Sequence, residues 1–96
     1  MGFDEAAADR MMELLEEGLR KRGLHVRPRL DYRDTHLWVV LTREGVGEVF
    51  LFRRRDWWES YLHGDQEEQR AVLKELIDES RMRISVRTRK VLGPDY

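Results

Sequence analysis

The fold is decided by residues 24–53, which read LHVRPRLDYRDTHLWVVLTREGVGEVFLFR. From Leu24 to Arg33 apolar and polar residues alternate, and this pattern predicts a strand with one apolar and one solvated face. Pro28 lacks an amide hydrogen, so this strand should lie at the edge of a sheet or contain a bulge. In residues 37–42 both parities are apolar, which predicts a central strand buried on both faces.

Two glycines, Gly45 and Gly47, follow the central strand and supply the turn of a hairpin, so residues 49–53 are expected to return as its partner. Ahead of this β-rich stretch, residues 4–22 predict a helix that Asp4 caps. Apolar residues recur in it at spacings of three and four: Ala8, Met11, Met12, Leu15 and Leu19.

Two signals for helix starts follow the hairpin. Asp56 is followed three residues later by Glu59, and Asp65 is followed in the same way by Glu68. Such pairs are typical of a capping box, in which each side chain satisfies a backbone N–H of the first turn. They predict a short helix and then a longer one that ends near Ser80.

The last part of the chain, residues 82–89, alternates again and predicts a final strand. Its apolar parity is Met82, Ile84, Val86 and Thr88, and its polar parity is Arg83, Ser85, Arg87 and Arg89. The expected order is therefore α-β-β-β-α-β, with the middle helix split in two. This order predicts one α+β domain over residues 1–96, with a mainly antiparallel sheet and helices on one face.

The composition restricts the class of protein. The chain has 96 residues and no cysteine, which excludes disulfides, thiolate zinc sites and thiol nucleophiles. No apolar run approaches the roughly 20 residues that a membrane-spanning helix needs. The N-terminal segment is acidic where a signal peptide would be basic. We therefore expect a cytoplasmic protein with no membrane partner.

Opposite charges gather in different parts of the chain, although the net charge is only −1. Residues 1–18 contain six acids and one base, whereas residues 81–90 contain five bases and no acid. A basic face on a small domain is typical of proteins that hold something anionic. We expect a non-catalytic binding module that contacts nucleic-acid backbone or another acidic partner through an arginine-rich sheet surface.

The expected nucleic-acid surface combines arginines on the solvated parities of the first and last strands with one tryptophan as a stacking platform for a base. Its members are Arg27, Arg29, Arg33, Arg83, Arg87, Arg89 and Trp38. The alternative is a solvated face whose arginines pair with acids and cover apolar surface with their stems. The order of the strands decides whether the two rows of arginines merge.

A second expected contact surface is the aromatic group Trp57, Trp58 and Tyr61. Successive residues of a helix point about 100° apart, so the two tryptophans cannot both face the same core. Exposed aromatic residues are enriched at protein interfaces. The group supports an alternative function, a protein–protein interaction domain that acts as a homodimer or as a small inhibitor or adaptor, with the acidic helices taking part. A cover over one end of the core is an equally good interpretation.

No cofactor, metal or small-molecule substrate is expected. The sequence contains no glycine-rich phosphate loop, no nucleophile elbow and no histidine pair at metal spacing. The best group for a metal is Asp31, Asp34 and His36, which could gather two carboxylates and an imidazole near one turn. Asp34 is explained more simply as a turn residue.

Two families have a similar order of elements. The α-β-β-β-α part resembles the double-stranded RNA-binding domain, whose second helix begins with lysines, whereas residues 64–68 here are acidic. The full α-β-β-β-α-β order resembles the restriction-endonuclease-like core, in which Asp34 would match the first metal-binding aspartate. The next strand of that family carries a Glu-x-Lys pattern, and this chain has Leu51, Phe52 and Arg53 there. The resemblance implies at most an inactive relative, so we expect no enzymatic activity.

Overall fold

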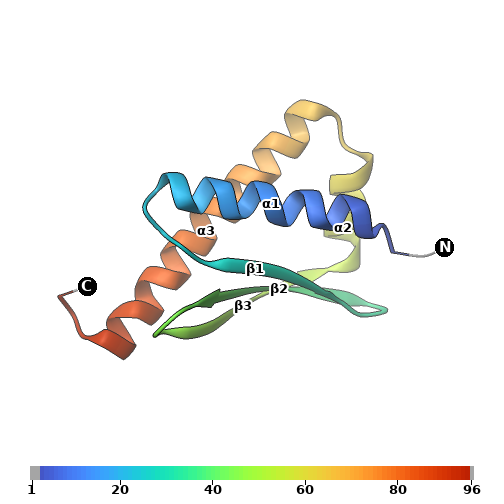
Figure 1. The fold of residues 1–96 in the computed structure, drawn as a ribbon. Helices are drawn as coiled ribbons and strands as arrows, with labels where there is room; N and C mark the ends of the chain where they lie inside the picture. The colour runs from blue at the N-terminus through green and yellow to red at the C-terminus, as the bar shows by residue number, and fades with distance from the viewer. Residues whose placement is uncertain (1–2, 96) are drawn as a thin grey trace.

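The computed structural model describes residues 3–95, which form three helices and three strands (Figure 1). In chain order the elements are α1 (Glu5–Lys21), β1 (Arg27–Tyr32), β2 (His36–Arg43), β3 (Gly47–Arg54), α2 (Arg55–His63) and α3 (Gln66–Leu92). The α+β class, the antiparallel strands and the division of the second helical region into two helices agree with the sequence-based expectation.

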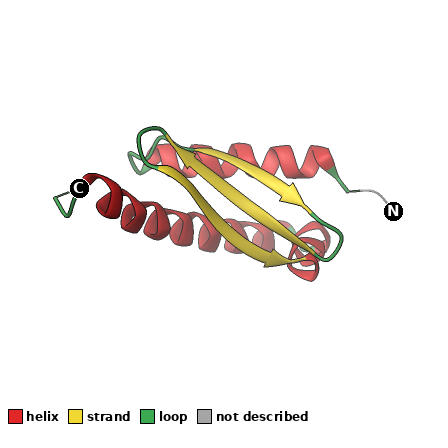
Figure 2. Ribbon diagram, turned by 90° about the horizontal axis from the view of Figure 1, so that it is seen from below, coloured by secondary structure: helices red, strands yellow, loops and turns green. Residues whose placement is uncertain are grey.

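β2 is the central strand of an antiparallel sheet with the order β1-β2-β3. Val39 of β2 pairs with Leu30 of β1 on one side and with Leu51 of β3 on the other. β1 is therefore an edge strand, as Pro28 predicts. Figure 2 shows the helices behind the sheet, with α1 on the β1 side and α3 on the β3 side. One face of the sheet is thus covered and the other is open.

The core lies between the sheet and the helices. It contains alternate residues of β2 and β3, the apolar stripe predicted for α1, and side chains of α2 and α3. The fully buried members with the largest side chains include Met11, Leu15, Leu19, Leu37, Leu41, Leu51, Trp58, Leu76 and Ile84. Gly18 lets α1 approach α3 closely, because a Cβ at this position would meet the Cδ1 of Ile77. Close helix packing therefore fixes α1 and α3 on the same face of the sheet.

Two of the three predicted helix starts are confirmed. Asp4 caps α1 and Asp65 caps α3, each accepting a hydrogen bond from a backbone N–H three residues further on, at 3.0 and 2.8 Å. α2 begins at Arg55, one residue before Asp56, which lies in the first turn instead of at the cap. Its carboxylate still lies near the positive end of the helix dipole.

The predicted final strand, residues 82–89, is wrong, because α3 continues through this segment without a glycine or proline to stop it. Ile84 and Thr88 are four residues apart and both are buried, which is the spacing of a helix face. Met82 and Val86, also four apart, are exposed on another side of α3. Each of these two pairs forms a row along the helix. Because the two rows are offset by two residues, together they give the same alternation in sequence as a strand. The α-β-β-β-α-β order loses its last element, and the resemblance to the restriction-endonuclease-like core loses a strand with it.

The outer edge of β3 is occupied by arginine side chains. The guanidinium of Arg83 donates to the carbonyl of Phe50 at 3.4 Å, and that of Arg53 donates to the carbonyl of Phe52 at 2.8 Å. Both carbonyls therefore point away from β2. The β3 edge is covered by side chains of the same molecule.

The outer edge of β1 is different. The N–H of Arg33 donates to the carbonyl of His36 at 2.8 Å, so the backbone groups of this residue face β2. Residues two apart in an antiparallel ladder turn their N–H and C=O groups to the same side. The intervening residues of β1, which are Pro28, Leu30 and Tyr32, therefore turn their backbone groups toward the free edge.

Candidate nucleic-acid interface

The open face of the sheet carries an aromatic cluster centred on Trp38 of β2. The ring centroid of Trp38 lies 5.1 Å from that of Phe52, 6.3 Å from that of Phe50 and 6.0 Å from that of His36. Phe50 and Phe52 are 48% and 47% exposed, values typical of surface residues. We call these four residues the aromatic face. The two phenylalanine rings are accessible on the face of the sheet that the helices leave uncovered, and Figure 2 shows the sheet from this face.

Strand alternation places the two phenylalanines on this face. Val49 and Leu51 of β3 are buried against the helices, so the residues between and after them point the other way. The strand was predicted from its sequence, but Phe50 and Phe52 were not among the residues predicted for the nucleic-acid surface. The alternation of buried and exposed residues in β3 was the signal that could have identified them. Val40 of β2 shares the open face, yet it is only 1% exposed because longer neighbours cover it.

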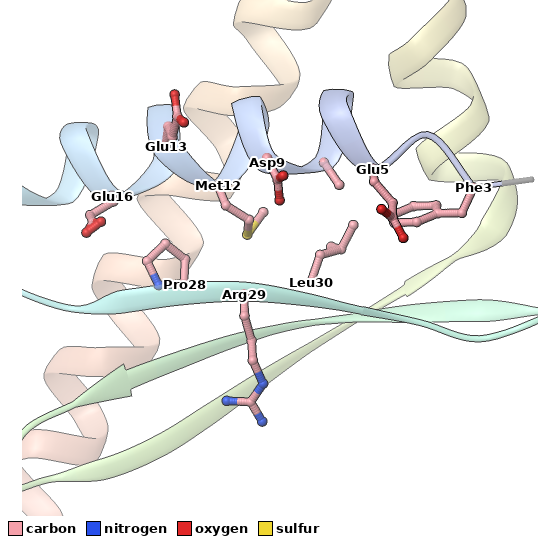
Figure 3. A pocket seen from close by; sticks show the side chains of 10 residues that line it. Phe3, Glu5, Asp9, Met12, Glu13, Glu16, Pro28, Arg29 and Leu30 are labelled. Carbon is pink, nitrogen blue, oxygen red and sulfur yellow. The ribbon is translucent and has the colours of Figure 1, made fainter.

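Arg29 of β1 also belongs to the open face, and Figure 3 shows its side chain leaving β1 on the side opposite α1. Its Nη1 donates to the Oε2 of Glu48 on β3 at 2.8 Å, so the side chain reaches across β2. This hydrogen bond and the positive charge of Arg29 lower the pKa of Glu48, against a smaller opposing effect of desolvation. Glu48 is therefore a carboxylate of the open face whose charge an arginine neutralises.

The other arginines predicted from the β1 region lie nearby. Arg27 is exposed on the same face, two residues before the arginine that bridges to β3. Arg33 pairs with Asp31 at 3.2 Å. These last two residues line a hollow of about 440 Å³ together with Trp38 and Phe50. The structure thus brings the β1 arginines and the predicted stacking platform together.

The C-terminal arginines reach the sheet from a helix. Arg83 and Arg87 of α3 line a hollow of about 270 Å³ with Lys90, and Phe50 forms part of the same hollow. Lys90 was not among the residues predicted for the nucleic-acid surface. Arg89 lines a different hollow, of about 330 Å³, on another side of α3. The two predicted arginine rows therefore do not merge as neighbouring strands. Arg83 and Arg87 flank the aromatic face from the β3 side, whereas Arg89 lies outside it.

The predicted contact surface at Trp57, Trp58 and Tyr61 is not an exposed patch. Trp58 is 2% exposed and Tyr61 is 8% exposed, and burial raises the pKa of the Tyr61 hydroxyl. Trp57 is partly buried, and the guanidinium carbon of Arg53 lies 5.3 Å from its ring centroid. These side chains close one end of the core. Trp58 and Tyr61 are therefore not accessible to a partner, Trp57 is partly exposed, and the group fits the alternative interpretation as a cover over one end of the core.

Asp31 and His36 near the β1–β2 turn take part in other interactions. Asp31 pairs with Arg33, and the Nδ1 of His36 lies 3.1 Å from the hydroxyl of Thr35. Within residues 3–95, no group of three histidine or acidic side chains could hold a metal ion. In the same described part of the chain, no helix is long and apolar enough to cross a membrane.

No protein-family profile, no curated protein and no solved structure matches this chain. What the surface can do follows from its own side chains. Aromatic rings offer faces on which bases stack, and guanidinium groups donate charge-assisted hydrogen bonds to phosphate. The open face of the sheet carries both kinds of group.

Proposed function

We propose that the protein is a non-catalytic module that binds single-stranded nucleic acid on the open face of its sheet. The observation that supports this most is the pair Phe50 and Phe52, nearly half exposed beside Trp38 on a face flanked by arginines. Aromatic side chains stack with unpaired bases of any sequence and contribute about 1–3 kcal/mol per base. Bases in a duplex are already stacked on their neighbours, so a single strand suits this surface better.

Arginines that could contact phosphates lie on both sides of the aromatic face, and one of them, Arg29, is paired with Glu48. Arg27 and Arg29 come from β1, whereas Arg83 and Arg87 come from α3 beside β3. Neighbouring strands lie about 4.8 Å apart, so the outer strands are separated by roughly 10 Å. A nucleic-acid strand that crosses the aromatic face would pass from one pair of arginines to the other.

The acidic side of the molecule supports the same orientation. α1 carries most of the acids of the N-terminal region and lies on the covered face of the sheet (Figure 1). A polyanion is repelled from that side and attracted to the arginines of the open face. The charge separation seen in the sequence thus favours one binding face over the other.

Binding can be measured with labelled 12-nucleotide single-stranded RNA and DNA and with the matching duplex. We expect the single strands to bind more tightly, with little dependence on sequence. The logarithm of the affinity should fall with the logarithm of salt concentration by about 0.7 per phosphate contacted, which is measurable between about 50 and 200 mM salt. Absence of binding at the lower concentration, or preference for the duplex, would contradict the proposal.

Variants separate stacking from charge. Trp38→Ala should weaken binding by about 1–3 kcal/mol. Arg83→Gln combined with Arg87→Gln should flatten the salt slope by about 1.4. The matched control is Arg70→Gln with Lys74→Gln, which removes the same charge from exposed positions in the N-terminal half of α3. Equal effects of both pairs would indicate general attraction to net charge instead of a site.

The proposal also includes the absence of catalysis and a cytoplasmic location. A divalent metal near Asp34 would lack the second carboxylate and the lysine of the Glu-x-Lys pattern, so we expect labelled oligonucleotides to stay intact with Mg²⁺. Cleavage that disappears in Asp34→Ala would contradict this. The lack of cysteine suits a reducing compartment, where RNA and single-stranded DNA are accessible.

A second candidate function rests on the same exposed phenylalanines. Two copies that pack their open faces together would bury Phe50 and Phe52 and form a homodimer. Such a dimer would tolerate salt and would dissociate in Phe50→Ser, whereas nucleic-acid binding falls as salt rises. Sedimentation at micromolar concentration with and without oligonucleotide distinguishes the two functions.

A further inference from the structure

A groove between α1 and the free edge of β1 lies on the covered side of the sheet, away from the aromatic face (Figure 3). Its volume is about 520 Å³. Apolar side chains from both elements line it, and acids of α1 stand above them. The apolar floor is made by Ala8 and Met12 of α1 and by Pro28 and Leu30 of β1.

The backbone of β1 offers hydrogen-bonding groups at this groove. Within residues 3–95, β1 has a neighbouring strand on one side only. The ladder register turns the N–H and C=O of Leu30 and the C=O of Pro28 away from β2. An edge of this kind can accept an extended segment of another chain as an additional strand. The opposite edge, at β3, already receives the guanidinium groups of Arg53 and Arg83.

The charge of the groove selects the kind of segment. Figure 3 shows the carboxylates of Asp9 and Glu16 directed toward the β1 side of α1, whereas that of Glu13 points away from the strand. Among the ion pairs formed within residues 3–95, Glu13 pairs with Arg10, and neither Asp9 nor Glu16 takes part. Two carboxylates above an apolar floor therefore face the space beside the strand edge.

The spacing of the acids is compatible with an extended chain. Asp9 and Glu16 are seven residues apart, or about 10.5 Å along the axis of α1. Side chains on one face of an extended segment repeat every two residues, or about 6.6 Å. Two basic side chains four residues apart, about 13 Å, could therefore reach both acids through their flexible stems.

We propose that this groove binds an extended, basic segment of a partner protein, which adds to β1 as a fourth strand and places lysine or arginine side chains against Asp9 and Glu16. Charge complementarity identifies this occupant. A second copy paired through its own β1 would bring a second α1 to the same edge, and like charges would repel. The inference goes beyond nucleic-acid binding and does not depend on it.

The probe is an end-blocked, fluorescent octapeptide of alternating lysine and valine, and the control peptide carries glutamate in place of lysine. The lysine peptide should bind with an affinity that falls as salt rises, and the glutamate peptide should not bind. Asp9→Asn with Glu16→Gln should weaken binding about five- to tenfold, the effect of two exposed ion pairs. Glu67→Gln with Glu75→Gln on exposed positions of α3 is the matched control and should leave the affinity unchanged. No binding at low salt, or equal losses in both double variants, would overturn the proposal.

Strand addition is tested separately from charge. Hydrogen exchange at the amide of Leu30 should slow when the lysine peptide is added. Two further peptides carry N-methyl groups on alternate backbone nitrogens, in one frame or the other. The peptide whose methyl groups replace the N–H groups that face β1 should lose binding. The peptide whose methyl groups point away from β1 should still bind. Unchanged exchange at Leu30, or equal binding of both methylated peptides, would overturn strand addition even if the charge variants respond.

Discussion

Two aromatic clusters centred on tryptophan differ in what covers them. Trp58 lies 5.5 Å from Phe3 and 5.8 Å from Tyr61 between ring centroids, and it is 2% exposed. Trp38 has neighbours at similar distances, yet its two phenylalanine neighbours on β3 are nearly half exposed. The first cluster lies between helices and sheet, whereas no element within residues 3–95 covers the second (Figure 2). The difference shows that aromatic density alone does not mark a binding surface. Exposure depends on whether a second layer packs against the cluster.

The largest expected effect is on stability in the buried cluster. Trp58→Ala should lower the free energy of unfolding by about 3–5 kcal/mol, because it removes a fully buried ring and leaves a cavity. Trp38→Ala should cost less than half as much. Urea unfolding followed by circular dichroism measures both. Equal losses would mean that the open-face tryptophan supports the core as strongly as the buried one.

The next largest effect concerns the binding of nucleic acid by the aromatic face. Phe52→Ala should weaken the binding of single-stranded nucleic acid by about 1–3 kcal/mol, because one stacking ring is lost. The free energy of unfolding of Phe52→Ala should differ little from that of the wild type, since the Phe52 side chain is about half exposed. Phe3→Ala is the comparison from the buried cluster, where the ring of Phe3 stacks on that of Tyr32 at 4.2 Å. It should reduce stability and leave the affinity of the folded protein unchanged. A loss of affinity in Phe3→Ala together with a loss of stability in Phe52→Ala would contradict the distinction between the two clusters.

A smaller effect of opposite sign is expected at Glu48. Glu48→Gln removes the only carboxylate that holds Arg29 by a hydrogen bond within residues 3–95 and so frees the guanidinium for phosphate. Binding should tighten severalfold, and the salt slope should steepen by about 0.7. Glu44→Gln, an exposed acid in the adjacent turn, removes the same charge without releasing Arg29. If both variants tighten binding equally, net charge and not the freed arginine is responsible.

The smallest effect is the pH dependence of that same ion pair. Arg29 lowers the pKa of Glu48 in the folded protein. A group with a lowered folded pKa stabilises the fold above its unfolded pKa, about 4.3 for glutamate, and this stabilisation is lost as pH falls through the folded value. The difference in free energy of unfolding between the wild type and Glu48→Gln should be constant above about pH 5 and shrink below about pH 4. Unfolding in urea across this pH range measures it, and a difference that grows on acidification would contradict the assignment.

Much of the fold could be predicted because local chemistry and packing agree. Asp4 and Asp65 cap helices where the sequence places them, and Pro28 lies on an edge strand. The strand prediction for residues 82–89 was wrong because the same alternation also arises in a helix, where residues four apart share one side. Only tertiary packing selects between them, since Ile84 and Thr88 face the core in the helix.

The candidate site was predicted in part. Arg27, Arg29 and Trp38 share the open face, as expected from their parity. Alternation also implies that Phe50 and Phe52 lie there, but the sequence alone does not say whether a helix covers them. The same missing information left two interpretations open for Trp57, Trp58 and Tyr61, a contact surface and a cover over one end of the core. Sequence parity tells which residues share a face, and it does not tell which face is covered.

The arginines on the outer carbonyls of β3 have a consequence for behaviour at high concentration. End-to-end polymerisation of copies into a fibre requires one open edge at each side of the sheet, so that β1 of one molecule can join β3 of the next. Arg53 and Arg83 occupy the β3 side, and Pro28 removes a donor from the β1 side. These features therefore disfavour edge-to-edge polymerisation of a protein that displays exposed phenylalanines and an unpaired strand edge.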